Sequence, residues 1–293
     1  MGLHPTSTGK VRDLFDLGDR LLIVACDRIS AYDVVLDDLI PGKGAILTRM
    51  SVEWCRILAG IVPHHVISTD PSDFPPPFDR EPALPGRSML VHKARRLDVE
   101  CIVRGYLAGS AWREYQQTES VSGLRLPAGL RCAERLAHPI FTPSTKAVGG
   151  HDMNLEPEEF RRLVGGDVAA RLAAVSVALY EHAARQALER GIIIADTKFE
   201  FGFQGDRLLL IDEVLSPDSS RFWAADACQT GRVPQSFDKQ DLRDWLDASG
   251  WNHAPPPPRL PAEVVRRTAE RYGEALRRLF PLAAVELLGK ETA

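Results

Sequence analysis

The residues best suited to chemistry lie in one stretch, GIIIADTKFEFGFQGDRLLLIDEV, at positions 191–214. Asp196, Lys198 and Glu200 alternate with Thr197 and Phe199, so in a β-strand the three charged side chains share one face. Hard cations such as Mg²⁺ bind carboxylate oxygens and leave positions for phosphate, whose charge an ammonium neutralises. The pattern therefore indicates either a Mg²⁺–phosphate site or a solvated hairpin with cross-strand ion pairs.

The turn that follows the charged strand decides where a fourth charge lies. A three-residue loop, Gln204-Gly205-Asp206, pairs position 203 with 207 and places Asp212 opposite Lys198, on the same face as Glu200. A two-residue loop sends Asp212 to the other face, because a shift of one residue exchanges the two faces of a strand. We expect the three-residue loop, which places Asp212 on the face that carries Asp196, Lys198 and Glu200.

A polar loop, SPDSSR, follows the second strand and ends in Arg221. Next to a pair of apolar strands, such a loop is better explained by ligand binding than by solubility. An arginine at its end can hold an anion. This loop favours the Mg²⁺–phosphate interpretation of the hairpin.

Near the N-terminus, Gly9-Lys10 opens an expected hairpin over residues 11–25, and Arg12 shares a strand face with Lys10. A glycine lets the backbone approach a phosphate, and two cations can clamp it. The GxxxxGK[ST] spacing of a Walker loop is absent. The segment is thus either an ordinary turn or a phosphate loop of another type. Lys93 lies in a further expected strand, SMLVHKARR.

The segment ECIVRGYLAGSAW predicts a strand, a loop and a helix. Arg104 follows three apolar residues, so we expect it to be partly buried and to need a partner. That partner is either Glu100 in a structural ion pair or the carboxylate or phosphate of a ligand. Ser110, near the start of the helix, either caps it or donates to a phosphate.

The segment HPIFTPSTKAVGGHDMNL lacks periodicity and predicts a loop, whose chemical groups are Lys146, His151 and Asp152. Helices are expected over 44–58, 156–164, 167–190, 238–248 and 262–280, and a strand over 61–68. The proline-rich residues 70–86 are expected to form a surface excursion.

Composition narrows the class of protein. A net charge of −4 gives no basis for nonspecific nucleic-acid binding, and no stretch approaches the roughly 20 apolar residues of a membrane span. The five cysteines are scattered without a CxxC pair, which argues against a zinc ribbon or a disulfide framework. We therefore expect a cytoplasmic protein with reduced cysteines, without nucleic-acid or membrane partners. The oligomeric state stays open between monomer and homodimer.

Several long motifs together resemble the SAICAR synthetase family, from about Thr8 to Trp223. They occur in the family's order: TGKVRDLF, CDRISAYD, ECIVRGYLAGSAW, FTPSTKAVGGHD, IADTKFEFG and IDEVLSPDSSRFW. The resemblance implies an α+β fold of two lobes with ATP in the cleft between them. The expected lobes are a small, mostly antiparallel sheet over residues 1–95 and a larger sheet flanked by helices over 96–293.

The resemblance also implies an activity, in which carboxyaminoimidazole ribotide (CAIR) and L-aspartate condense to SAICAR at the expense of ATP, through an acyl phosphate, with Mg²⁺. It implies the following roles: Lys198, Asp196 and Lys146 catalytic; Gly9, Lys10, Arg12 and Lys93 for ATP; Arg104, Ser110, Asp152, Arg221 and Ser30 for substrate; Glu200 and Asp212 for the metal.

Two other classes of protein are alternatives to this ligase. A small-molecule kinase-like phosphotransferase also fits a two-lobed cleft with metal-binding acids, although the HRD and DFG motifs of protein kinases are absent. A nucleotide-binding module without catalysis is the second rival. The full set of acids and lysines in the central hairpin argues against it.

Overall fold

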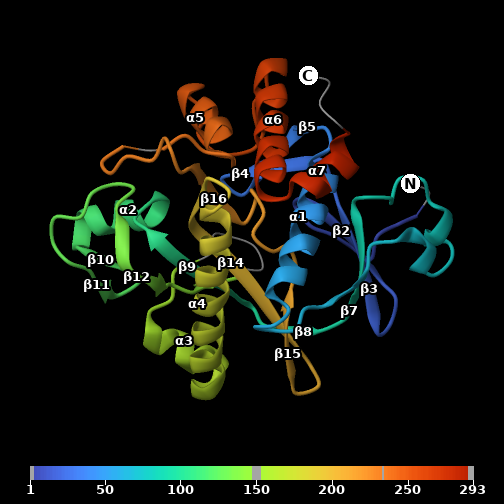
Figure 1. The fold of residues 1–293 in the computed structure, drawn as a ribbon, viewed down its shortest axis with the longest axis horizontal. Helices are drawn as coiled ribbons and strands as arrows, with labels where there is room; N and C mark the ends of the chain where they lie inside the picture. Colours follow the sequence, from blue (N-terminus) through green and yellow to red (C-terminus); the bar gives the residue numbers. More distant parts are fainter. Residues whose placement is uncertain (1–2, 147–152, 233, 290–293) are drawn as a thin grey trace.

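The computed structural model describes residues 3–146, 153–232 and 234–289, and two antiparallel sheets organise them (Figure 1). The small sheet has the strand order β1-β2-β3-β7-β6. Its strands are β1 (Ser7–Thr8), β2 (Arg12–Asp16), β3 (Arg20–Ala25), β7 (Ser88–His92) and β6 (Val66–Ser68).

Both faces of the small sheet are covered, because its strands are apolar on both sides. Leu22, Val24 and Leu90 pack under Phe74 and Phe78 of the proline-rich segment, which forms the short 3-10 helices Pro71–Asp73 and Phe78–Arg80. The opposite face, with Ile23, Met89 and Val91, packs against Val52 of helix α1.

The large sheet is built on β14 (Ile192–Gln204), which pairs with β9 (Val99–Tyr106) on one side and with β15 (Arg207–Ile211) on the other. β12 (Arg135–Phe141) and β13 (Ser144–Thr145) pair with β9, whereas β8 (Arg95–Arg96) and β16 (Ser220–Ala224) pair with β14. Four strands thus contact β14 along its length, which makes it the central element of the molecule.

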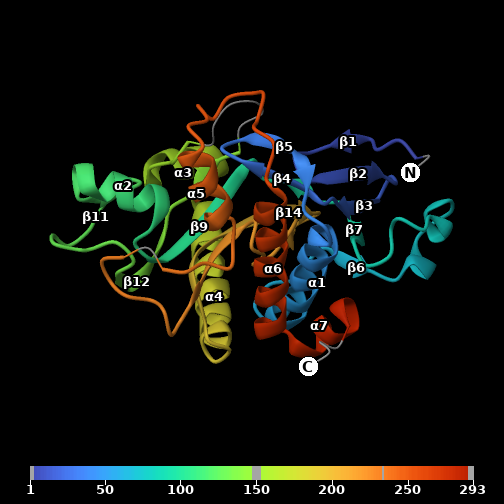
Figure 2. The ribbon, with the colours of Figure 1, turned by 90° about the horizontal axis from the view of Figure 1, so that it is seen from above.

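Helices cover one face of the large sheet, and Figure 2 shows α4, α6 and α1 side by side there. The helices are α1 (Lys43–Leu58), α2 (Gly109–Thr118), α3 (Pro157–Val164), α4 (Gly166–Leu188), α5 (Gln240–Ala248), α6 (Ala262–Leu279) and α7 (Pro281–Leu288). In the described ranges, no helix alone is long and apolar enough to cross a membrane; α3 and α4 meet that test only as a pair bent by 117°.

Two small hairpins complete the structure: β4 (Arg28–Ala31) with β5 (Val34–Leu39), and β10 (Ser120–Val121) with β11 (Leu124–Arg125). The main hydrophobic core contains Ile29 of β4, Trp54 of α1 and Phe199 of β14. This core therefore crosses residue 95, and the division of the chain at that residue stays a prediction.

The predicted fold class is confirmed, whereas some of the predicted elements are wrong. Residues 138–155 do not form one continuous loop, because β12 and β13 occupy part of this segment and pair with β9. The strand expected over 61–68 is limited to Val66–Ser68, and helix α7 was not expected. The strand 99–106 and the helices α1, α3, α4, α5 and α6 lie close to their predicted places.

Candidate active site

One face of the large sheet carries the charged residues singled out in the sequence. On β14, Asp196 lies directly opposite Arg104 of β9, and Lys198 lies opposite Ile102. Directly opposite residues of an antiparallel pair share a face, so by alternation Glu100 and Glu200 also lie on it. The other face, with Phe199, packs into the helix-covered core.

Asp196 joins two arginines on this face. Its Oδ2 accepts hydrogen bonds from Arg104 Nη1 at 3.0 Å and from Arg221 Nη1 at 2.5 Å, and Arg104 Nε also donates to Thr142. Burial lowers the pKa of the enclosed Arg104 guanidinium. The alternative partner Glu100 is thus wrong for Arg104, because Glu100 pairs with Lys198 instead.

These arginines line a cavity of about 200 Å³, together with Ser110 at the start of α2. No side-chain hydrogen bond caps α2, so Ser110 lies in a first turn whose N–H groups remain available to an anion. Gly109 precedes it with φ of 56°, and an added Cβ there would lie 2.2 Å from the Arg221 guanidinium. Glycine at this position therefore allows Arg221 to reach the cavity.

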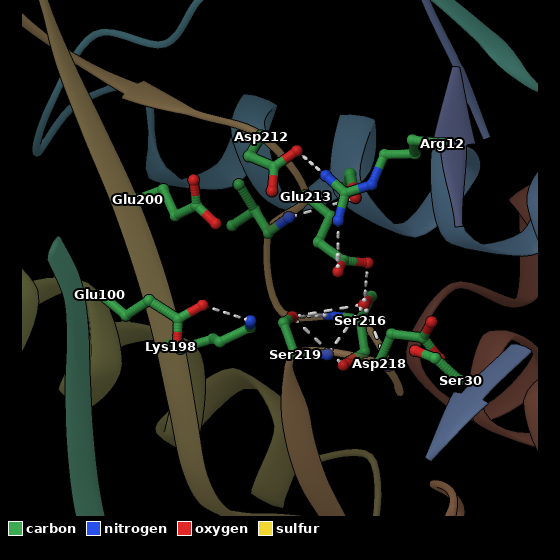
Figure 3. A network of polar contacts seen from close by, with 12 residues as sticks. Arg12, Ser30, Glu100, Lys198, Glu200, Asp212, Glu213, Ser216, Asp218 and Ser219 are labelled. Atoms are coloured by element: carbon green, nitrogen blue, oxygen red, sulfur yellow. Dashed lines mark hydrogen bonds and ion pairs between the residues drawn. The ribbon is translucent and has the colours of Figure 1, made fainter. Parts of the chain in front are cut away.

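Lys198 is held in its charged form. Its Nζ lies 2.6 Å from Glu100 Oε1 (Figure 3). Burial lowers the pKa of this ammonium, but the carboxylates of Glu100 and Glu200 outweigh burial and leave the pKa above its usual value. Lys198 is thus a fixed cation rather than a proton donor near neutral pH.

Glu200 is buried and forms an ion pair with Lys146. Burial raises the pKa of its carboxyl group, yet the charges of Lys146 and Lys198 outweigh burial, and the pKa lies below its usual value. The ionised carboxylate lines a second, larger cavity of about 520 Å³. An ionised oxygen ligand facing a cavity suits a hard divalent cation.

The predicted register of the hairpin is wrong by one residue. Gln204 pairs with Arg207 across a two-residue turn, so Glu200 lies opposite Ile211 rather than sharing a ladder face with Asp212. Nevertheless, Asp212 lines the same cavity as Glu200, because β15 ends at Ile211 and Asp212 adopts φ of 65°. Figure 3 shows both carboxylates on the cavity side of β14.

The N-terminal part of the chain forms the opposite wall of the larger cavity, with Gly9, Lys10, Arg12 and Ser30. Arg12 forms ion pairs with Asp212 and with Glu213, the latter at 2.8 Å, and so joins the small sheet to the metal-ligand candidate. The Lys10 ammonium lies 2.5 Å from Asp33. The predicted phosphate-binding and metal-binding groups thus meet in one cavity.

The structure places two other predicted residues differently from the sequence-based expectation. Lys93 follows β7, is largely exposed and pairs with Asp16 at 2.6 Å, outside the residues that line the larger cavity. Ser30, expected beside the substrate groups, lines the larger cavity instead of the smaller one that contains Arg104. Asp152 lies outside the described residues.

The two cavities share two wall residues, Lys198 and Asp218. Sequence reasoning did not single out Asp218, although it lies within the SPDSSR loop that was expected to bind a ligand. Nor did it find Lys239, a buried lysine that also lines the larger cavity. In the sequence, Lys239 is marked only by its place in the Asp238-Lys239 pair just before α5. Polar residues are common at the start of a helix, so this pair does not indicate a functional site.

Among the described residues, no three His, Cys, Asp or Glu side chains form a group that could hold a metal by themselves. Mg²⁺ does not require such a group, since it usually binds one or two carboxylates together with water and substrate phosphate. Glu200 and Asp212 fit that donor set.

Comparison with known proteins agrees with this geometry. The chain matches the family model described as SAICAR synthetase over residues 5–258. A phosphoribosylaminoimidazole-succinocarboxamide synthase of Syntrophobacter fumaroxidans is 53% identical over 282 residues, covering 95% of this chain and 93% of that protein. The SAICAR synthase of Saccharomyces cerevisiae, in a structure complexed with SAICAR, is 43% identical with a TM-score of 0.87, covering 95% of both chains.

A more distant structure, described as a type-2 SAICAR synthetase in complex with ADP, is 21% identical with a TM-score of 0.70 and covers 94% of this chain and 97% of that one. This likeness shows the fold alone. The family model and the relatives of 43% and 53% identity show the family as well as the fold. The chain therefore belongs to the SAICAR synthetase family and is a ligase of purine biosynthesis, a phosphoribosylaminoimidazole-succinocarboxamide synthase.

Proposed function

We propose that this enzyme condenses CAIR with L-aspartate at the expense of ATP, giving SAICAR, ADP and phosphate through an acyl phosphate. The observation that carries this proposal is the pair of cavities with Lys198 in their shared wall. Transfer of a phosphoryl group between two substrates requires two adjoining sites with a cation between them. The larger cavity is suited to ATP and the smaller one to the ribotide.

In the larger cavity, the ATP phosphates would lie near Gly9, Lys10 and Arg12. They would compete with the carboxylates of Asp33 and Glu213 for Lys10 and Arg12. The adenine would pack against the apolar residues Leu14 and Ile23 of the small sheet, which line the same cavity. A cavity of about 520 Å³ is within the usual range for a small-molecule site.

Glu200 and Asp212 would hold Mg²⁺, with phosphate oxygens and water completing its coordination. The ion would supply charge neutralisation for the transferring phosphoryl group. Lys146 and Arg12 pair with these two carboxylates, and both carboxylates line the larger cavity.

In the smaller cavity, Arg104, Arg221 and Ser110 would hold the phosphate of the ribotide, and Asp196 would keep the two guanidiniums in place. Guanidiniums bind phosphate oxygens in a bidentate geometry that a lysine cannot reproduce. The carboxylate of CAIR would then point toward Lys198.

A carboxylate is a poor electrophile, so it must be activated before an amine attacks it. The CAIR carboxylate would attack the γ-phosphate of ATP, and Lys198 would offset the repulsion between the two anions. L-aspartate would then displace phosphate from the acyl phosphate. Lys146, which pairs with Glu200 in the larger cavity, would contact the transferring group.

A direct assay tests the proposal. Purified enzyme is given every combination of CAIR, L-aspartate, ATP and Mg²⁺, and both ADP and SAICAR are measured. We expect stoichiometric ADP and SAICAR only when all four are present. Stable phosphorylation of CAIR without L-aspartate, with no amide product in the full mixture, would instead identify a phosphotransferase of the kinase-like type.

A further inference from the structure

A buried charged centre adjoins the two cavities and is not used in the function proposed above. Asp218 Oδ2 lies 2.9 Å from Lys43 Nζ and 3.1 Å from Lys239 Nζ, and Asp218 Oδ1 accepts a hydrogen bond of 2.5 Å from the Tyr272 hydroxyl. Lys239 Nζ also donates to the backbone oxygen of Ser30 at 3.2 Å. Figure 3 shows Asp218 beside Ser30 at the edge of the site.

The residues of this centre come from separate parts of the chain. Lys43 begins α1, Asp218 lies in the loop before β16, Lys239 precedes α5 and Tyr272 lies in α6. Lys43 and Tyr272 have no exposed surface. A centre assembled by four segments fixes the position of each member more tightly than a single ion pair on a helix surface does.

The charges of this centre do not balance when both lysines are protonated. Two ammoniums face one carboxylate, which leaves one excess positive charge in a buried position, where charge is costly. Release of one proton balances the centre. Lys239 is the member that can release it, because Lys239 lines the larger cavity whereas Lys43 lines neither cavity.

We propose that Lys239 is the base that accepts the proton which the L-aspartate ammonium must lose before its nitrogen attacks, and that Lys43, Asp218 and Tyr272 are positioning residues for it. This inference rests on the proposed function, since it concerns the second half of that reaction.

Neutral Lys239 takes one proton from the substrate ammonium and becomes an ammonium itself. The freed nitrogen lone pair forms the C–N bond at the acyl phosphate carbon, and the C–O bond to the phosphate then breaks with its electron pair. The departing phosphate takes the second nitrogen proton, which leaves a neutral amide. Lys239 returns its proton to solvent through the cavity.

The surroundings of Lys239 support a base rather than a permanent cation. Burial, with smaller contributions from Lys43 and from Arg243 of α5, lowers the pKa of Lys239 to about 8 against the attraction of Asp218. The Asp218 carboxyl stays ionised, because its pKa, raised by burial, is lowered well below the usual range by the two lysines. Lys198 differs, since its pKa is raised and it stays charged.

Hydroxylamine separates the two halves of the reaction. It is largely uncharged near neutral pH, so it can capture an acyl phosphate as a hydroxamate without a base. Wild type, Lys239→Arg and Lys239→Met are each given ATP, Mg²⁺ and CAIR with either L-aspartate or hydroxylamine. Lys239→Arg keeps the charge but cannot accept a proton near neutral pH.

We expect Lys239→Arg to lose about 100-fold or more in kcat with L-aspartate, which is the usual contribution of a general base. Hydroxamate formation should stay within about twofold of wild type in both variants. Full L-aspartate turnover by Lys239→Arg would overturn the base role and leave only a cationic one. An equal loss with both nucleophiles would place Lys239 in the first step instead, and would also overturn it.

Failure of the proposed function would look different. In that case, neither wild type nor the two Lys239 variants would form hydroxamate from CAIR and ATP. Hydroxamate from wild type together with unaffected L-aspartate turnover in the variants would refute only the role of Lys239.

The positioning role is tested by Tyr272→Phe, which removes the hydrogen bond to Asp218. Without this hydrogen bond, the Asp218 carboxylate should hold the Lys239 proton more strongly. The pH at which kcat with L-aspartate rises should therefore move to a higher value. The pH profile of hydroxamate formation should stay unchanged. Tyr115→Phe is the matched control, since the Tyr115 hydroxyl donates to the backbone oxygen of Pro127, in a separate hydrophobic cluster. Equal pH profiles for Tyr272→Phe and Tyr115→Phe would refute the positioning role.

Discussion

Asp196 and Arg104 face each other across neighbouring strands, and the same Asp196 oxygen also accepts a hydrogen bond from Arg221. One carboxylate thus holds two guanidiniums in a smaller cavity that is suited to an anion. Its removal should therefore affect the folded state as well as substrate binding.

We predict that Asp196→Asn lowers the free energy of unfolding by about 3 kcal/mol, because Arg104 remains buried without its counter-charge. Urea denaturation of the ligand-free enzyme measures this change. Asp226→Asn, at an exposed position in the turn after β16, serves as the control and should change stability by less than about 0.5 kcal/mol. Equal stability of the two variants would show that Arg104 does not depend on Asp196.

We predict that Glu200→Gln and Asp212→Asn each lower kcat by about 100-fold or more and raise the Mg²⁺ concentration needed for half-maximal rate. Each variant replaces a carboxylate that lines the larger cavity with an amide. Rates measured over a Mg²⁺ titration give both quantities, and Glu189→Gln, exposed at the end of α4, is the control. An unchanged Mg²⁺ requirement in both variants would remove them from the metal site.

We predict that CAIR labelled with ¹⁸O in its carboxylate passes one labelled oxygen to the released phosphate, since that oxygen joins carbon and phosphorus in an acyl phosphate. Mass spectrometry of the phosphate detects the transfer. Lys198→Met should slow the appearance of labelled phosphate by at least about tenfold, because the fixed cation between the cavities is lost. Retention of all label in SAICAR would contradict the acyl phosphate.

We predict that Lys10→Met raises the KM for ATP at least about fivefold, whereas Lys93→Met changes it by less than about twofold. Lys10 lines the larger cavity, and Lys93 pairs with Asp16 outside it. The same substitution at two exposed lysines makes each variant the control for the other. A larger effect at Lys93 would restore the role that the sequence resemblance implies for it.

We predict that His65, a buried histidine on the wall of the larger cavity, makes the free energy of unfolding depend on pH. Burial lowers the pKa of His65 from 6.5 to about 3, with smaller contributions from His64, Arg12 and His92. Between these pH values the unfolded chain binds a proton that the folded protein excludes, so stability falls as pH falls, by about 1.4 kcal/mol per pH unit.

His65→Gln should therefore remove this slope from the curve of unfolding free energy against pH between about pH 6 and 4. The exposed His138 provides the control His138→Gln, which should keep the wild-type slope. Parallel curves for His65→Gln and wild type would show that His65 binds its proton equally in the folded and unfolded states.

The sequence predicted the charged face of β14 well, because period-two alternation along a strand does not depend on distant contacts. The position of Asp212 shows where such reasoning fails. The turn at Gly205 is one residue shorter than expected, and on a regular strand this would have turned Asp212 away from Glu200. The backbone at Asp212, with positive φ, compensates, and no local pattern predicts that conformation.

The residues that sequence analysis missed are those whose role comes from tertiary packing. Lys43 looks like a solvent-facing residue at a helix start, and Lys239 resembles any lysine before a helix. Only the folded chain brings them to Asp218. Likewise, the segment 138–155 has the composition of a loop, but pairing with β9 turns part of it into strands.

The continuous strand β14 limits how mutations can alter the distance between the two cavities. Asp196 in the smaller cavity and Glu200 in the larger one lie four residues apart on one continuous strand, a separation of about 13 Å at 3.3 Å per residue. Inserting or deleting a residue between them would shift one site by about 3.3 Å and also exchange charged side chains with Phe199. Natural or laboratory variants should therefore alter the distance between the substrates through the surrounding loops, and not through this strand.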